Sequence, residues 1–284
     1  MKKIIPFLII LLIGMDNLLA QGNRPLFEEM PGMVSYTYRD SFSKDVAATL
    51  DTLQAMGIKD MEFSNLFGTT AAEIRKLLDE RGMHCSSFGV GYADLVTKTQ
   101  EVAANAKTLG AKFVRVAWIP HEAPFGLSDA QKAIADFNKA GKILKEEHDL
   151  TFCYHNHGYE FYPYKNGTLF DYMMEQTDPE YVSYEIDILW TFFTGVDPAA
   201  LIHKYPDRFK LMHLKDLKKG VEGNMSGGTP KENDVVLGTG QLDLPAILKA
   251  AKEAGIEHFY IEDESPVYYQ QVPKSIAFLQ GLRY

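Results

Sequence analysis

Two histidines at alternate positions are the first residues of this sequence that suggest chemistry. They are His155 and His157 in the string TFCYHNHGYEF, which runs from Thr151 to Phe161. Residues two apart on an extended strand point to the same face, so both imidazoles share one face of the strand predicted here. Imidazoles serve as general acids and bases and as metal ligands. A half-exposed strand end that carries two histidines by chance is the simpler alternative.

Further ionisable residues stand near the ends of other predicted strands. They are Glu62 in DMEFSN, Glu185 and Asp187 in VSYEIDILW, His213 and Lys215 in FKLMHLKD, and Glu262 in FYIEDE. Each alone has an ordinary explanation, such as a helix cap or a buried structural histidine. Together they would converge on one mouth, where burial without partners would be costly. One divalent cation would relieve that cost, and manganese, magnesium, cobalt or zinc suits mixed oxygen and imidazole ligands.

The strands that would position these residues belong to a repeating unit. A helix-patterned segment that ends in glycine is followed by a short apolar run in LQAMGIKDMEF, LDERGMHCSSF, AKTLGAKFVRVAW and AKEAGIEHFYIED. The glycine suits the left-handed position that closes a helix, and the apolar run suits a buried parallel strand. This alternation predicts an α/β architecture.

The pattern predicts eight strands and eight intervening helices. The strands are Met33–Tyr38, Asp60–Phe63, His84–Gly89, Phe113–Trp118, Thr151–His155, Val182–Asp187, Phe209–His213 and His258–Glu262. The helices are roughly Ser43–Met56, Thr70–Arg81, Leu95–Leu109, Ser128–Glu147, Leu169–Gln176, Pro198–Lys204, Leu244–Ala254 and Val267–Leu282. We therefore predict a single-domain (β/α)8 TIM barrel over residues 24–284. A doubly wound open sheet is the alternative, but no glycine-rich dinucleotide fingerprint follows the first strand.

The start of the chain and its charge restrict location and partners. Two lysines, an apolar run from Ile4 to Gly14 and a small residue at Ala20 predict a signal peptide over residues 1–20. The run is short for a membrane span, so we expect an exported, periplasmic protein with no stable membrane anchor after cleavage. The net charge of −9 argues against a nucleic-acid or anionic-membrane partner.

Two other features of the sequence carry expectations. Cys85 and Cys153 lie in apolar strand-like segments, and we expect two buried thiols rather than a disulfide. The segment from Leu217 to Gly240 is long enough to form a lid or a binding loop. Its Gly238-Thr239-Gly240 could cradle a phosphate, although such a pattern more often only turns the chain.

The strings YHNHGYEF, EIDILWTFFTGVDP and RFKLMHLKD resemble the sugar phosphate isomerase/epimerase family of the xylose isomerase-like barrel superfamily. The resemblance runs from about Val34 to the C-terminus. It implies a divalent metal held by Glu, Asp, His and Glu from separate strand ends, where Asp187, His213 and Glu262 match the last three. Many relatives have Glu inside the fifth strand, where this sequence has His155. We expect Glu160 to be the first ligand, with His155 as the alternative.

Such a site suits proton transfer at a carbon next to a carbonyl group, through an enediolate. His157 or His155 is predicted to act as the acid and base, and Lys215 to stabilise charge. Glu185 is expected to support the metal or act as a base, and Glu62 to bind a sugar hydroxyl. Tyr36, Trp118 and Trp190 could line a sugar ring. The resemblance implies an isomerase or epimerase acting on a small carbohydrate. Expulsion of a β-leaving group would instead give a dehydratase or lyase that acts on a keto-sugar or 3-keto-glycoside. The predicted export and the His-Asn-His strand are two reasons to consider this elimination.

Two other classes of protein are alternatives to a sugar-converting enzyme. A metal-dependent endonuclease would need more ligands and a basic face. A non-catalytic sugar-binding protein would keep its binding when His157 is replaced. By analogy with related barrels, a homo-oligomer is also considered.

Overall fold

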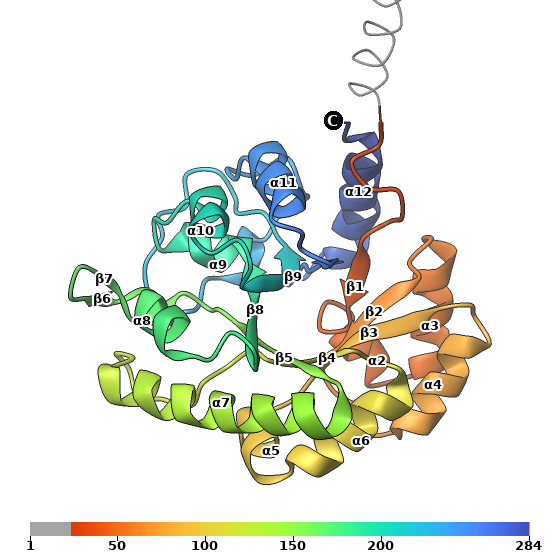
Figure 1. Ribbon diagram of the computed structural model, residues 1–284. Helices are drawn as coiled ribbons and strands as arrows, with labels where there is room; N and C mark the ends of the chain where they lie inside the picture. Colours follow the sequence, from red (N-terminus) through yellow and green to blue (C-terminus); the bar gives the residue numbers. More distant parts are fainter. Residues whose placement is uncertain (1–23, 284) are drawn as a thin grey trace, which may run out of the picture.

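The computed structural model describes residues 24–283; the predicted signal peptide, residues 1–20, lies outside this range. Parallel strands close into an eight-stranded barrel in the order β1-β10-β9-β8-β5-β4-β3-β2 (Figure 1). They are β1 (Gly32–Val34), β2 (Asp60–Phe63), β3 (His84–Gly89), β4 (Phe113–Val116), β5 (Thr151–His155), β8 (Val182–Asp187), β9 (Phe209–Leu214) and β10 (His258–Ile261). The predicted (β/α)8 barrel is confirmed.

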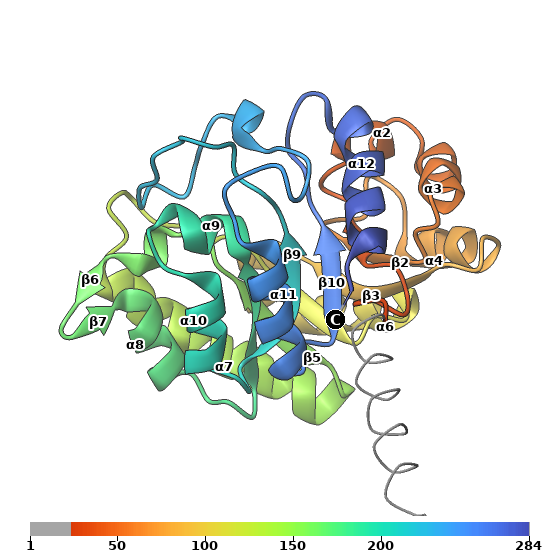
Figure 2. The same cartoon turned by 90° about the horizontal axis from the view of Figure 1, so that it is seen from above.

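Helices surround the strands, as the view from above shows (Figure 2). They are α2 (Arg39–Phe42), α3 (Val46–Ala55), α4 (Ala71–Asp79), α5 (Tyr92–Thr97), α6 (Thr99–Leu109), α7 (Leu127–His148), α8 (Leu169–Gln176), α9 (Ile188–Phe193), α10 (Pro198–Lys204), α11 (Leu244–Glu253) and α12 (Tyr268–Gly281). A hairpin of β6 (Pro163–Tyr164) and β7 (Gly167–Thr168) and two short 3-10 helices, η1 (Tyr159–Phe161) and η2 (Lys231–Asn233), lie between them.

Several predicted elements differ at their ends. β1 stops at Val34 rather than at Tyr38, because the amide of Thr37 donates to the carbonyl of Val34 and begins a turn. Helix α3 stands where the helix Ser43–Met56 was predicted and is capped by the side chain of Asp45, whereas the short helix α2 was not predicted. Helices α5 and α6 likewise divide one predicted helix. The glycines predicted to close helices have positive φ angles, as expected, at Gly57, Gly82, Gly110 and Gly255.

The interior of the barrel consists of an apolar layer beneath a polar one. Val34, Phe113, Cys153, Leu211 and Tyr260, one from each of five strands, form the apolar layer. Because side chains alternate along a strand, residues two positions further on, such as His155 after Cys153 and His213 after Leu211, enter the barrel above this layer. Cys85 and Cys153 are buried free thiols, as predicted.

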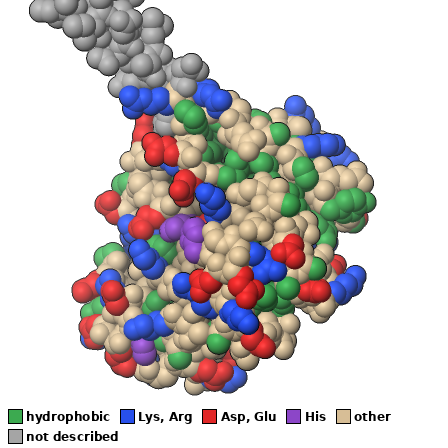
Figure 3. Space-filling model, turned by 90° about the vertical axis from the view of Figure 1, so that its right-hand side faces the viewer, with side chains coloured by type: hydrophobic (Ala, Val, Ile, Leu, Met, Phe, Trp, Pro, Cys, Tyr) green, Lys and Arg blue, Asp and Glu red, His purple; other side chains and the backbone are tan. Residues whose placement is uncertain are grey.

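The two ends of the described chain lie side by side. The amide of Leu26 donates to the carbonyl of Leu282 at 3.1 Å, and the N-terminal segment runs beside α12 (Figure 1). No helix in residues 24–283 is long and apolar enough to cross a membrane. On the face in Figure 3 acidic and basic side chains are interspersed, without a continuous basic patch.

Candidate metal centre and active site

Four buried side chains meet at the carboxyl ends of β5, β8, β9 and β10. They are His155, Asp187, His213 and Glu262. Oδ2 of Asp187 lies 3.7 Å from Nε2 of His155 and 3.9 Å from Nδ1 of His213, and the same nitrogen of His213 lies against Oε2 of Glu262. The donor atoms of the last three residues are all within 4.8 Å of one another. The structure therefore brings together three of the four predicted ligands and the alternative fourth.

A second pair of carboxylates fixes the orientation of both imidazoles. Nδ1 of His155 lies 3.0 Å from Oε2 of Glu185, and Nε2 of His213 lies 2.8 Å from Oε1 of Glu62. One ring nitrogen of each histidine is thus held by a carboxylate, which leaves Nε2 of His155 and Nδ1 of His213 directed toward Asp187. Metal-binding histidines are commonly oriented by such carboxylates.

Arg115 compensates the charge of these two carboxylates. Its Nη2 donates to Glu62 at 2.5 Å, and its Nε lies 3.3 Å from Glu185. Burial alone would raise the pKa of Glu62, but Arg115 and His213 lower it to about 2. Ser87 donates to the second oxygen of Glu62 at 2.6 Å. Both oxygens of Glu62 are therefore used, and the prediction that Glu62 binds a sugar hydroxyl has to be corrected.

The buried group offers an incompletely satisfied carboxylate to a cation. Oδ1 of Asp187 accepts from the amide of Trp190 at 2.9 Å, which caps α9. Oδ2 is buried and has no hydrogen-bond donor among the described residues. Burial raises the pKa of Asp187 to about 6. A buried carboxylate oxygen without a donor, beside two imidazole nitrogens and a second carboxylate, is a ligand set that fits a divalent cation.

Glu160 is the predicted ligand that the structure keeps away from this group. Its carboxylate accepts from the amide of His157, at 3.1 and 3.2 Å, and from the hydroxyl of Tyr154. Tyr154 belongs to the outward-facing row of β5 and packs on Phe137 of α7. Gly158, with φ of 94°, turns the chain after the strand, and η1 carries Glu160 to the outside of the barrel. The expectation that Glu160 holds the metal therefore has to be corrected in favour of His155.

A cleft of about 720 Å³ opens above the polar group. The predicted residues His155, His157, Trp190, Trp118 and Tyr36 all line it, together with His213 and Glu262. The ring of His157 stacks on Trp190 at 5.7 Å and meets the edge of Trp118 at 5.4 Å. Its Nδ1 has no hydrogen-bond partner in the described part of the chain. Burial and the charge of Lys215 lower the pKa of His157 to about 3, so its imidazole is neutral at pH 7.

Lys215 lies beneath the wall of the cleft among four carboxylates. Its Nζ is 3.1 Å from Glu264, 3.5 Å from Glu262, 3.8 Å from Asp234 and 3.9 Å from Asp187. Burial would lower the pKa of Lys215, but these carboxylates keep it well above its ordinary value. The ammonium group therefore stays charged.

Sequence reasoning missed Arg115 and Asp234. A charged residue in the middle of the apolar run FVRV was a usable signal for Arg115. Asp234 lies in the long loop after β9, where no periodicity shows which side chains turn inward. Its carboxylate accepts from the amide of Glu264 at 2.9 Å.

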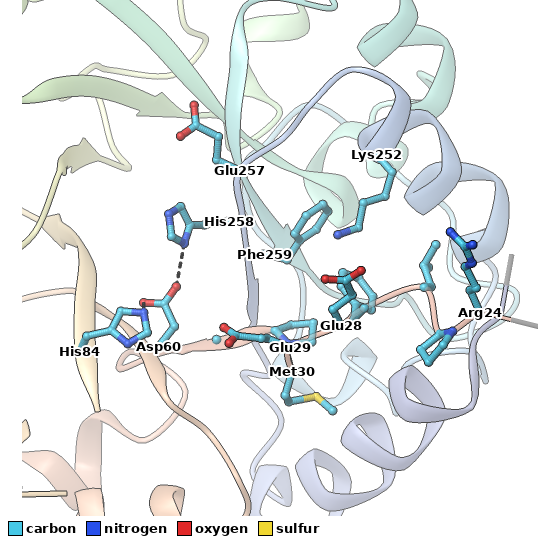
Figure 4. Close-up of a pocket in the computed structure, with 15 residues that line it drawn as sticks. Arg24, Glu28, Glu29, Met30, Asp60, His84, Lys252, Glu257, His258 and Phe259 are labelled. Carbon is cyan, nitrogen blue, oxygen red and sulfur yellow. Dashed lines mark hydrogen bonds and ion pairs between the residues drawn. The ribbon is translucent and has the colours of Figure 1, made fainter. Parts of the chain in front are cut away.

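A larger cavity of about 890 Å³ lies at the opposite end of the barrel. Figure 4 shows its residues, with Asp60 between His84 and His258. Nδ1 of His258 lies 2.8 Å from Asp60, which joins β10 to β2 across β1. Because functional groups of such barrels gather at the carboxyl ends of the strands, we assign the active site to the smaller cleft.

A closed parallel barrel with a buried polar group at the carboxyl ends of its strands defines a TIM-barrel protein with its functional site at that end. Residues 50–281 match the family model described as xylose isomerase-like TIM barrel, and the chain belongs to this family. It is 24% identical over 221 residues to an inosose dehydratase of Geobacillus kaustophilus, and this alignment covers 68% of this chain and 67% of that protein.

Two solved structures have the same fold. A sugar phosphate isomerase/epimerase from Parabacteroides distasonis superposes with a TM-score of 0.73 at 22% identity, over 89% of this chain and 96% of that one. The IolI protein, solved with a bound zinc atom, superposes with a TM-score of 0.68 at 14% identity, over 88% and 95%.

Proposed function

We propose that the protein is a divalent-metal-dependent carbon–oxygen lyase that acts on a small keto-sugar. The observation that carries the proposal is the donor-free Oδ2 of Asp187 beside His155, His213 and Glu262, at the base of a cleft lined by a neutral His157. A cation bound there would polarise the substrate carbonyl and stabilise the negative charge of the enediolate. The zinc of the structurally similar IolI protein and the name of the inosose dehydratase relative support this proposal.

His157 is the proposed base. Its Nδ1 has no hydrogen-bond partner among the described residues and its ring lines the cleft, so this nitrogen is free to accept a proton from the carbon next to the carbonyl. Stacking on Trp190 and packing against Trp118 hold the ring in place. The charged Lys215 lies close enough to favour negative charge on the substrate oxygens.

The proposed reaction needs no oxidant or second substrate. The C–H bond next to the carbonyl breaks, and its electron pair forms a carbon–carbon double bond. The bond between the β-carbon and its oxygen substituent then breaks, and the substituent leaves with a proton as an alcohol or water. The predicted export, which rests on residues outside the described range, agrees with a glycoside as the source of that substituent.

Isomerisation or epimerisation is the second candidate and shares the first step. The cleft supports it because Glu264, which follows β10, lines the wall away from β5 and His157. A carboxyl group there could return a proton to the other face of the enediolate.

Incubation in D2O separates the two reactions. Purified protein with manganese is given a 3-keto-glycoside and, separately, a panel of free ketoses. Release of the aglycone supports the lyase, whereas deuterium uptake without fragmentation supports the epimerase and contradicts the lyase. The variant His157→Ala should lose turnover by about 10²–10⁴-fold with its metal retained. Unchanged sugar binding in a wild type that turns over no substrate would instead favour a binding protein.

A further inference from the structure

The backbone amides best suited to hold a phosphate are occupied by the chain's own carboxylate. TIM barrels often bind phosphate with the loops after their seventh and eighth strands, and β9 is the seventh strand of this barrel. In the loop after β9, Oδ2 of Asp216 accepts from the amides of Gly238 at 3.0 Å and Gly240 at 2.9 Å. Oδ1 accepts from Leu217 at 2.9 Å and Leu242 at 3.2 Å. A Cβ atom at Gly240 would clash with this carboxylate. The possible phosphate cradle predicted at Gly238-Thr239-Gly240 is therefore filled.

Most cations near the cleft are paired with carboxylates. Arg115 is paired with Glu62 and Glu185, and Lys215 lies among four carboxylates. Among the described residues that line the cleft, Lys231 is the remaining cation, and its side chain is exposed on η2. Arg39 is not part of the lining; its guanidinium lies 4.3 Å from the ring centre of Tyr36 and donates to the carbonyl of Tyr36. A phosphate group in the outer cleft would face the carboxylates of Asp234 and Glu264, with Lys231 as the one unpaired cation of the described lining.

Exposed aromatic surface takes the place of a phosphate site. The large apolar side chains that are exposed in the described part of the chain all follow carboxyl ends of barrel strands: Tyr36 after β1, Trp118 after β4, and Val267 and Tyr269 after β10. Trp118 is 44% exposed and Tyr36 is 39% exposed, and both line the cleft. An exposed aromatic face at a binding site marks a surface for a ligand with apolar faces.

Trp118 is held as a rigid platform beside the proposed base. Its ring packs against Tyr159 at 4.7 Å and His121 at 5.3 Å, and it meets His157 at 5.4 Å. A ring that lies on Trp118 is therefore adjacent to the sugar whose proton His157 removes. This position suits the group attached through the leaving oxygen.

We infer that the substrate is an uncharged glycoside whose second ring lies on Trp118, and that a phosphorylated sugar is excluded. This inference rests on the proposed function and narrows its substrate class. It explains why the outer cleft combines exposed aromatic surface with carboxylates.

The test compares a matched pair of substrates with purified, manganese-loaded protein: a neutral 3-keto-glucoside with an aryl aglycone, and the same compound phosphorylated at the 6-position. We expect kcat/KM to be at least about 100-fold higher for the neutral compound, because placing like charges together costs several kcal/mol. Equal or faster turnover of the phosphorylated compound would overturn the inference and leave the lyase proposal intact. Absence of turnover and of deuterium uptake with every compound would contradict the proposed function itself.

Variants test the platform independently. Trp118→Ala should lower kcat/KM by about tenfold or more for the two-ring compound, and by less for a 3-keto-glucoside with a methyl aglycone, while Trp118→Phe should restore part of the loss. Tyr269→Ala is the control, because Tyr269 is 58% exposed and does not line the cleft. Equal losses for both aglycones in Trp118→Ala, with an unchanged melting temperature and metal content, would contradict a second ring on Trp118.

Discussion

At the scale of single residues, Asp187 and Glu160 have different predicted roles in metal binding. Asp187→Asn removes the negative charge of the donor-free oxygen, so we expect its affinity for manganese to fall by at least about 100-fold. Glu160→Gln should bind manganese as the wild type does, since the carboxylate of Glu160 points to the outside of the barrel. Titration of chelator-treated protein measures both. Loss of manganese binding in Glu160→Gln, in a variant that melts like the wild type, would restore the ligand set expected from the sequence.

The two carboxylates behind the histidines should matter almost as much as the ligands. Glu185→Gln and Glu62→Gln keep the size of the side chain but weaken its hold on His155 and His213. We expect each to weaken metal binding about 10–100-fold, as measured by competition with a chelator. Neither carboxylate lines the cleft, so unchanged metal affinity combined with a raised KM would mean that they act on substrate instead.

Glu160 also predicts a pH dependence of stability. Burial raises the pKa of Glu160 to about 7, from 4.5. The folded state therefore holds an extra proton between these two values, and stability falls as pH rises through this window. Glu160→Gln lacks this loss, so the free energy of unfolding of the variant relative to wild type should increase by about 3 kcal/mol from pH 4.5 to pH 8. Urea unfolding at several pH values measures it, and a difference that does not vary with pH would be contrary evidence.

What sequence could and could not predict is clearest at this scale. Asp187, His213 and Glu262 stand at strand ends, where period-two alternation and the motif agree on which side chains enter the barrel. Glu160 follows the strand, and alternation carries no information beyond the turn at Gly158. Glu62 also enters the barrel, as predicted, but its pairing with Arg115 depends on the register between β2, β3 and β4, which a single sequence does not contain.

At the scale of elements, the strands that carry the site were predicted best. β2, β3, β5 and β8 begin and end at the predicted residues. Helix α2 was not predicted, and α5 and α6 were predicted as one helix. A four-residue helix and the break at Lys98 depend on local turns that a 3.6-residue pattern does not resolve.

Packing of α7 against the barrel gives a prediction at the same scale. A Cβ atom at Gly141 would clash with the backbone oxygen of Tyr181, the residue before β8. Gly141→Ala should therefore destabilise the protein by about 1–3 kcal/mol, despite the better helix propensity of alanine. Lys139→Ala, at an exposed position of the same helix, should change stability by less than about 0.5 kcal/mol. Thermal unfolding of both variants measures this, and a Gly141→Ala variant as stable as the wild type would show that α7 can shift outward.

At the scale of the whole molecule, the barrel brings together residues up to about 200 positions apart in the sequence, from Glu62 on β2 to Glu262 directly after β10. The alternating pattern predicted this closure, and the family match agrees with it. Metal ligands and supporting carboxylates can be distinguished only in the closed barrel, because residues from five strands enter one layer of its interior. The substrate class that we propose likewise rests on the arrangement of loops, in which Asp216 fills the amide cradle and Trp118 stays exposed.

The most direct measurement of the central claim is a crystal structure of the manganese-loaded protein with anomalous diffraction data. We expect one strong anomalous peak bounded by Nε2 of His155, Oδ2 of Asp187, Nδ1 of His213 and the carboxylate of Glu262, at ligand distances of about 2.0–2.4 Å. A peak at Glu160, or a fully loaded protein with no peak among these four residues, would contradict it.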